Sequence, residues 1–213
     1  MFRFDCPLYP IVDTLGDPQL DPVAIAAGLI GAGVPLLQLR WKQPGMRQFV
    51  EVARVLRALT VRAGVRFIVN DRVDVARLVA ADGVHLGQDD LPVAAARELL
   101  GPSAIIGLST HNLSQAVAAE RSGAADYIGF GPMYATTSKE HPDPIQGVEG
   151  LQAARRQVGL PIAAIGGITT SRVPEVLRAG ADAVAMIGEI VRAPDIAARV
   201  AAIVSGAKPA GRG

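Results

Sequence analysis

The sequence predicts a single α/β domain built as a closed (β/α)8 barrel, the TIM-barrel architecture. Eight short apolar runs alternate with eight segments of helical periodicity, at about 25 residues per unit, which is the order of elements in that fold. The runs do not alternate with polar residues, as expected of parallel strands buried on both faces. Half of the residues are hydrophobic but only 4% are aromatic, which favours small side chains on helices packed against a parallel sheet.

The predicted strands are, in order, 8–12, 36–39, 67–69, 84–86, 104–108, 126–130, 161–165 and 183–187. The predicted helices follow them at 22–32, 46–62, 73–81, 92–100, 112–122, 148–157, 171–179 and 194–204. Asp21 and Pro22 are typical of a helix start, and Gly123 and Gly180 of the turns that follow helices. We expect the barrel to occupy residues 1–204 and residues 205–213 to form a disordered tail.

Composition and charge exclude several classes of function. A net charge of +1 gives no reason to expect a nucleic acid or an anionic membrane as partner. Cys6 is the single cysteine, so it cannot form an internal disulfide, and it suits a reducing cytosol. Glycines and Pro35 interrupt the longest uncharged run, 22–39, and the first residues lack a charged leader with an apolar core. We expect a soluble, cytoplasmic protein; whether it forms a homo-oligomer stays open.

Acidic residues follow two neighbouring strands. Asp71 comes after the run 67–69, and Asp90 follows the run 84–86. Neighbouring parallel strands lie about 4.8 Å apart and end at the same edge, so the two carboxylates could share one cation. Oxygen ligands without cysteine favour Mg²⁺ over zinc. The alternative is that Asn70 or Asp71 caps the helix at 73, and that Asp90 caps the next helix.

Basic residues follow the second strand. Gln38, Arg40 and Lys42 alternate along an extended segment and therefore point to one side, where they could clamp a highly charged anion such as pyrophosphate. Solvated side chains at the barrel rim are the alternative. Two of the three lysines, Lys42 and Lys139, fall in loops at this edge, which favours a functional role.

The later strands end in hydroxyls and glycines. Ser109 could bind an anion, or it or its neighbour Thr110 could cap the helix that follows. The long loop 131–146 carries hydroxyls and a lysine that suit phosphate contact and loop closure, namely Thr136, Thr137, Ser138 and Lys139. Gly166, Gly167 and Gly188 offer backbone amides, and the loops after the last two strands are the usual phosphate site of such barrels.

The histidines are not assigned to catalysis. His85 lies within a predicted strand and is expected to be a satisfied residue of the barrel interior. His111 and His141 lie in loops, and no carboxylate at a fixed spacing marks either of them as a general base.

Taken together, these motifs closely resemble the thiamine phosphate synthase family over nearly the whole barrel. The motifs are Gln38-Leu39-Arg40-Trp41-Lys42, Val69-Asn70-Asp71-Arg72, Gly83-Val84-His85-Leu86-Gly87-Gln88-Asp89-Asp90, Ser109-Thr110-His111, Gly129-Phe130-Gly131-Pro132, Thr136-Thr137-Ser138-Lys139 and Ile165-Gly166-Gly167-Ile168. The resemblance implies a transferase that joins a hydroxymethylpyrimidine pyrophosphate to a thiazole phosphate, with a dissociative loss of pyrophosphate. A thiazole phosphate tautomerase of the same fold and a non-catalytic phosphometabolite-binding barrel are the alternatives.

The resemblance also implies a role for each site residue. Pyrimidine-pyrophosphate contacts would come from Gln38, Arg40, Lys42, Asn70, Ser109 and Lys139, of which Arg40, Lys42, Ser109 and Lys139 would act in the chemical step. Asp71 and Asp90 would bind Mg²⁺. The thiazole-phosphate site would comprise Thr136, Thr137, Ser138, Gly167, Ile187 and Gly188. The sequence departs from the family where Gly188 replaces a frequent serine, where Trp41 replaces a smaller or charged residue, and in the elaborated loop 140–144.

Overall fold

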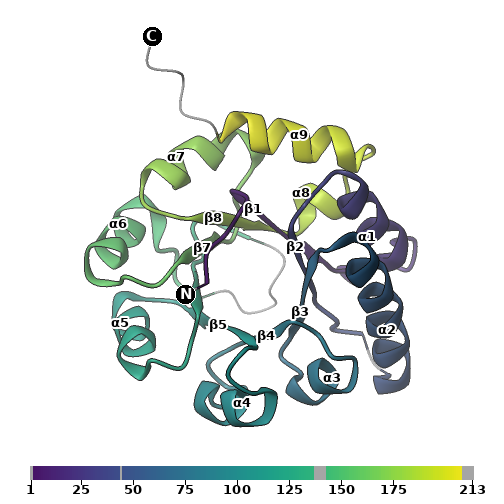
Figure 1. Cartoon of the computed structure of the whole chain (residues 1–213). Helices are drawn as coiled ribbons and strands as arrows, with labels where there is room; N and C mark the ends of the chain where they lie inside the picture. Colours follow the sequence, from purple (N-terminus) through teal and green to yellow (C-terminus); the bar gives the residue numbers. More distant parts are fainter. Residues whose placement is uncertain (1, 44, 137–142, 208–213) are drawn as a thin grey trace.

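Eight parallel strands close into a barrel in the computed structural model, which describes residues 2–43, 45–136 and 143–207. The strands are β1 (Leu8–Val12), β2 (Leu36–Leu39), β3 (Arg66–Asn70), β4 (Gly83–Leu86), β5 (Ile105–Thr110), β6 (Tyr127–Phe130), β7 (Ile162–Ile165) and β8 (Ala183–Met186). Each strand pairs with the next in sequence, and β1 also pairs with β8, which closes the ring (Figure 1). The predicted TIM-barrel architecture is therefore confirmed.

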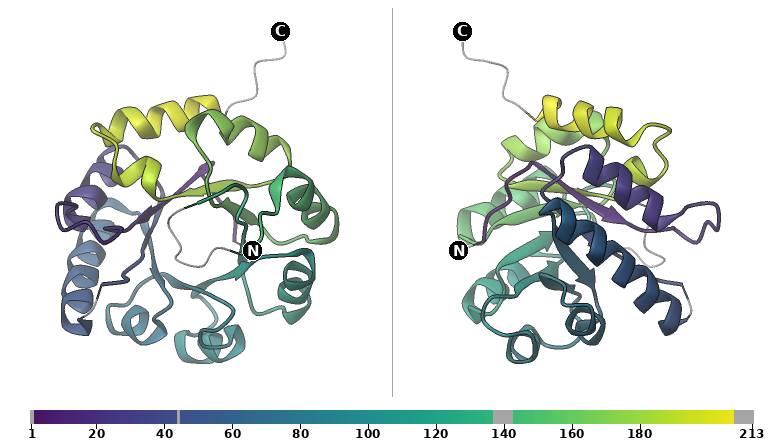
Figure 2. Two further views of the ribbon diagram at one scale, coloured as in Figure 1. Left: turned by 180° about the vertical axis from the view of Figure 1, so that it is seen from behind. Right: turned by 45° about the vertical axis from the view of Figure 1, so that its right-hand side comes forward.

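The helices form an outer layer around the strands, as the end-on views of Figures 1 and 2 show. They are α1 (Pro22–Gly31), α2 (Met46–Ala63), α3 (Val73–Leu78), α4 (Val93–Leu100), α5 (Leu113–Ser122), α6 (Gly147–Gln157), α7 (Val173–Arg178), α8 (Gly188–Val191) and α9 (Ile196–Gly206). A 3-10 turn, η1 (Thr170–Arg172), precedes α7. No helix within the described residues is long and apolar enough to cross a membrane.

Most boundaries differ from the prediction by one or two residues, and three helices depart from it in ways that matter for the fold. Helix α3 ends at Leu78, because Ala80 adopts a left-handed φ of 52° and turns the chain toward β4. The short helix α8 was not predicted, since four residues are too few for helical periodicity. Helix α9 continues through Ser205 to Gly206, so the first two residues of the predicted tail are helical; residues 208–213 lie outside the described part.

The N-terminal segment covers one end of the barrel. Phe4 contacts Tyr9 and Tyr127, with ring centroids 5.6 and 5.3 Å apart, and Phe2 packs edge-on against Phe4. Both tyrosines are buried in the barrel interior, in a cluster whose other buried hydrophobic side chains are aliphatic. These aromatic rings fill the N-terminal end of the barrel, so the chemistry is left to the opposite end.

Aspartates fasten the strands at the same N-terminal end. Asp126, just before β6, accepts a hydrogen bond from the backbone N–H of Ile106 at 2.8 Å and from Arg97 at 2.6 Å. Asp82 and Asp182 repeat the arrangement before β4 and β8, with Arg57 and Arg155 as their ion-pair partners and the backbone N–H of Phe67 and Ile162 as donors. Each clamp joins a strand to its neighbour and to the helix before that neighbour. These clamps hold the strands in register at the N-terminal end of the barrel.

Candidate active site

The predicted site residues gather at the C-terminal ends of the strands. Arg40 and Lys42 follow β2, Asp71 follows β3, Asp90 follows β4, and Ser109 lies near the end of β5. All eight strands of the described barrel run parallel, so these ends share one mouth. This is the face at which barrels of this architecture carry their chemistry.

An ion pair that the sequence analysis missed holds Arg40. The Arg40 guanidinium donates to Asp13, which directly follows β1 and is 3% exposed. The other carboxylate oxygen of Asp13 accepts from the Leu15 N–H at 2.7 Å, so the aspartate is itself fixed. An acidic residue directly after a strand was the available signal, but no role was predicted for Asp13.

Lys42 and Asp71 meet across the ends of β2 and β3. Lys42 Nζ lies 2.5 Å from Asp71 Oδ2, and the lysine remains 53% exposed, so it can also reach a ligand at the mouth. Asp71 has a left-handed backbone with a φ of 63°. Aspartate tolerates that conformation better than most residues, and such conformations often occur at functional sites.

Asp90 lies against Asp71. Burial raises the pKa of the Asp90 carboxyl above its ordinary value, and the neighbouring Asp71 carboxylate adds to the shift. The Gly87 N–H, which donates to Asp90 Oδ2 at 2.7 Å, and the Lys42 cation oppose it. Two neighbouring carboxylates favour the binding of a cation.

The helix-cap alternatives are wrong. The residue before α3 is Arg72 and the residue before α4 is Pro92, and neither makes a side-chain capping bond within the described residues. Asn112 caps α5 by accepting from the Gln115 N–H, so neither Ser109 nor Thr110 does so. Asn70 ends β3 beside His85 in the strand register. The polar residues at these strand ends therefore need another explanation than capping.

Gln38 and Ser109 are linked through the barrel interior. Gln38 donates to Tyr9 at 2.8 Å, and Ser109 Oγ lies 2.9 Å from His85 Nε2. Tyr127 joins Tyr9 to His85. His85 is buried with both ring nitrogens bonded, which confirms its prediction as a satisfied interior residue.

The environment of His85 keeps its ring neutral. Burial lowers the pKa of His85 to about 4, with the Asp71 carboxylate opposing the shift and His111 adding to it. The imidazole is therefore neutral at pH 7.

Glycines shape the opposite side of the mouth, at the ends of β7 and β8. Gly167 has a φ of 63°, and a Cβ there would lie 2.3 Å from the Ala135 carbonyl oxygen, so the loop after β6 packs directly on it. Gly188 begins α8 after Ile187, and a Cβ there would meet no described atom within 4 Å. Gly188, which stands where the resembled family often has a serine, therefore has room for a side chain among the described atoms.

The loop after β6 is described only in part. Its first turn is held by bonds from Met133 N–H to the Ile165 carbonyl and from Tyr134 N–H to the Gly166 carbonyl. Thr136 is the last described residue of that turn. Thr137, Ser138 and Lys139, which were predicted to contact the substrates, lie outside the described residues, as do Glu140 and His141.

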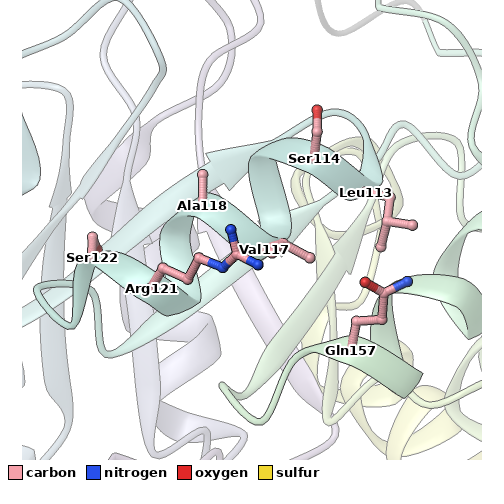
Figure 3. Close-up of a pocket in the computed structure, with 7 residues that line it drawn as sticks. All are labelled: Leu113, Ser114, Val117, Ala118, Arg121, Ser122 and Gln157. Atoms are coloured by element: carbon pink, nitrogen blue, oxygen red, sulfur yellow. The ribbon is translucent and has the colours of Figure 1, made fainter.

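Trp41 stacks on Phe49 of α2, with centroids 6.0 Å apart and planes 11° apart, so it packs against the helix layer. Figure 3 shows a groove on the outside of the barrel, lined by α5 residues such as Leu113 and Val117 and by Gln157 of α6. The groove contains none of the predicted site residues.

Comparison with known proteins gives a consistent result. A family model described as "Thiamine monophosphate synthase" matches residues 8–190. The thiamine-phosphate synthase of Chloroflexus aurantiacus is 48% identical over 195 residues, covering 91% of this chain and 89% of the relative. That of Pelotomaculum thermopropionicum is 50% identical over 182 residues, covering 85% of this chain and 83% of the relative.

Solved structures agree with these relatives. A thiamine phosphate pyrophosphorylase from Pyrococcus furiosus superimposes with a TM-score of 0.85 at 35% identity, and 96% of each chain is covered. An orotidine 5'-phosphate decarboxylase from Pyrococcus horikoshii reaches a TM-score of 0.69 at 15% identity, covering 95% of this chain and 99% of that chain. The second likeness concerns the fold alone.

Proposed function

Because the chain belongs to the thiamine monophosphate synthase family, we propose that it is a transferase that makes thiamine monophosphate. Its substrates would be hydroxymethylpyrimidine pyrophosphate and hydroxyethylthiazole phosphate, and pyrophosphate would be the second product. The observation that carries this proposal is the cluster of Lys42, Asp71 and Asp90, in which two carboxylates and a cation from three strand ends lie in contact.

The basic side of the cluster suits the pyrophosphate. Arg40 is oriented by Asp13 and Lys42 by Asp71, so both cations are positioned before any substrate arrives. Fixed cations can stabilise the charge that develops on a leaving pyrophosphate without reorganising during the reaction. Asn70, Gln38 and Ser109 would contribute neutral hydrogen bonds to the same substrate, and Lys139 would add a third cation from the loop.

The acidic side suits Mg²⁺. Asp71 and Asp90 lie next to each other at the mouth of the barrel. This fits Mg²⁺, which is commonly held by one or two carboxylates and completes its shell with water and substrate phosphate. When bound, the ion would neutralise negative charge on the pyrophosphate.

The glycine side suits the thiazole phosphate. Gly167, Ile187 and Gly188 would offer backbone amides to the monophosphate, together with Thr136, Thr137 and Ser138 from the loop after β6. The loops after β7 and β8 are the common phosphate site of these barrels. The two phosphorylated substrates would then meet over the same mouth.

The residues favour a dissociative reaction. The bond between the pyrimidine methylene carbon and the pyrophosphate oxygen breaks first, and its electron pair leaves with the oxygen. The lone pair of the thiazole nitrogen then forms the new C–N bond to the resulting cation. The positioned side chains within the described residues supply charge stabilisation, which is what this route requires.

The test is a reaction with both substrates. The purified protein, incubated with the pyrimidine pyrophosphate, the thiazole phosphate and Mg²⁺, should release pyrophosphate and thiamine monophosphate in equal amounts, and neither product when one substrate is omitted. A tautomerase would rearrange the thiazole phosphate without releasing pyrophosphate, and a binding protein would do neither.

We place the enzyme in the cytoplasm, where the free thiol of Cys6 would stay reduced.

A further inference from the structure

A single file of hydrogen bonds crosses the barrel interior from Gln38 to Ser109. It runs from Gln38 Nε2 to Tyr9 Oη at 2.8 Å, to Tyr127 Oη at 2.8 Å, to His85 Nδ1 at 3.0 Å, and from His85 Nε2 to Ser109 Oγ at 2.9 Å. The five residues come from β2, β1, β6, β4 and β5. Both ends of the file are residues that the proposed function assigns to the pyrimidine substrate.

Gly107 leaves the room that this file of hydrogen bonds needs. Gly107 lies between His85 and Tyr127 in the strand register, as the partner of both. A Cβ at Gly107 would lie 2.2 Å from the Tyr127 ring and 2.4 Å from His85 Nδ1. Any larger residue there would separate the tyrosine from the histidine. Because polar groups in such an interior are costly unless they are paired, the file is a built feature and not a filler of the core.

The first donor sets the direction of every bond in the file. The amide nitrogen of Gln38 can only donate, so Tyr9 accepts, and the hydrogen of Tyr9 then has Tyr127 as its acceptor. Burial raises the pKa of both phenols, so each keeps its hydrogen at neutral pH. Tyr127 in turn donates to Nδ1 of His85, which must be the bare nitrogen. A neutral ring then carries its hydrogen on Nε2 and donates it to Ser109.

We propose that this file makes Ser109 a hydrogen-bond donor toward the bound substrate, with Tyr9, Tyr127 and His85 as positioning residues. Once Ser109 accepts from His85, its own hydrogen is the group left to face the mouth. A donor stabilises an anion there, whereas a serine that donated inward to His85 would present only lone pairs. The inference rests on the proposed function, because that function supplies the anionic substrate that Ser109 meets.

The first experiment reads the histidine directly and does not depend on activity. In protein labelled with ¹⁵N-histidine at pH 7.5, His85 should appear as the neutral tautomer with hydrogen on Nε2, identified by the loss of its signals in His85→Asn. In Tyr127→Phe the donor to Nδ1 is gone, and His85 should become a mixture of tautomers. A ring with hydrogen on Nδ1 in the parent, or an unchanged spectrum in Tyr127→Phe, would overturn the inference.

The second experiment asks whether Tyr127 acts through Ser109. Tyr127→Phe should lower kcat about 10- to 100-fold, as loss of supporting hydrogen bonds does elsewhere, with KM for the thiazole phosphate changed by less than about twofold. In a Ser109→Ala background the same change should have no further effect. Equal losses in both backgrounds, or an unchanged kcat in the parent, would show that Tyr127 does not position Ser109.

A matched control separates positioning from stability. Thr60→Val also removes a buried hydroxyl, one that bonds to the Arg57 carbonyl on α2 outside the strands, and it should leave kcat and the His85 tautomer unchanged. If the parent makes no thiamine monophosphate, the proposed function fails while the tautomer result still tests the file. If the parent is active and either result is negative, the inference alone fails.

Discussion

At the scale of single residues, the fold holds two carboxylates close together, although their repulsion would separate them in an unfolded chain. Asp71 and Asp90 lie in contact, and burial together with that contact raises the pKa of Asp90. Lys42 offsets part of the negative charge, yet it is half exposed, and among the described residues its ion-pair partner is Asp71. The two carboxylates therefore lower the stability of the folded protein but would favour the binding of a cation. Such a trade-off between stability and function is common at active sites.

Replacing Asp90 by Asn should separate these two effects. We expect Asp90→Asn to lower turnover about 100-fold or more at limiting Mg²⁺, because one of the two ligand charges is lost. The measurement is the steady-state rate across a Mg²⁺ titration. Asp89→Asn, which removes the same charge from the exposed neighbouring residue, is the matched control and should behave as the parent. Equal rates in the two variants would dismiss the assignment of the metal site.

The raised pKa of Asp90 also predicts how Mg²⁺ and pH act on stability. A carboxyl whose pKa is higher in the folded than in the unfolded protein stabilises the fold while protonated, and that contribution is lost as pH rises through the folded pKa. In the proposed site Mg²⁺ would bind the ionised pair and restore what is lost. The gain in Tm on adding Mg²⁺ should thus be larger at pH 8 than at pH 4, close to the ordinary pKa of the carboxyl, as measured by differential scanning calorimetry. A gain that is the same at both pH values would contradict the account.

Asp13 should matter through Arg40. In Asp13→Asn the amide oxygen can still accept from the Leu15 N–H, but the charge that orients Arg40 is gone. We expect KM for the pyrimidine pyrophosphate to rise about tenfold, as for loss of a charged supporting partner, with KM for the thiazole phosphate unchanged. Steady-state kinetics with each substrate varied in turn would measure this. Equal changes for both substrates would point to a general loss of structure instead.

At the scale of elements, the ends of β7 and β8 have opposite steric demands. Gly167 has a left-handed backbone in contact with the loop after β6, whereas Gly188 begins α8 facing open space. Both glycines were predicted for the same phosphate site, and only the packing distinguishes them. Packing around position 167 requires a glycine, whereas the packing around position 188 would accept a larger residue.

A pair of substitutions tests this difference. Gly188→Ser should fold normally and keep or lower KM for the thiazole phosphate, because the new hydroxyl meets no described atom and can add a phosphate contact. Gly167→Ala should raise that KM and lower Tm, because its Cβ would clash with the Ala135 carbonyl. Gly188→Ala controls for the added carbon. A Gly188→Ser protein that binds the thiazole phosphate less tightly than Gly188→Ala would contradict the prediction.

At the scale of the whole molecule, the two ends of the barrel carry separate tasks. Aromatic packing around Phe4 and clamps such as Asp126 with Arg97 hold the N-terminal end, and the charged cluster occupies the C-terminal end. Parallel strands impose this division, because all their C-terminal ends point the same way. Residues can therefore be assigned to stability or to chemistry by the end of the strand at which they lie.

The same geometry explains what the sequence could predict. The strands and the residues after them were predictable because apolar runs and the polar residues that end them are local signals. The interior file was not, because Tyr9 and Tyr127 are separated by 118 positions in sequence and look like ordinary core residues. Asp13 was missed for the same reason, since nothing near it in sequence identifies Arg40 as its partner.

One substitution at each end of the barrel tests this division of tasks. Asp126→Ala removes the acceptor of the Ile106 N–H and the partner of Arg97, and should lower the free energy of unfolding by about 1–3 kcal/mol while kcat stays within about twofold of the parent. Asp90→Asn should lower kcat and leave the metal-free Tm unchanged or higher. Because the two sites lie at opposite ends, the double variant should show the sum of both effects, measured by calorimetry and kinetics on the same samples. If kcat of the double variant fell well beyond that of Asp90→Asn alone, the two ends would be coupled, and the division of tasks between them would be wrong.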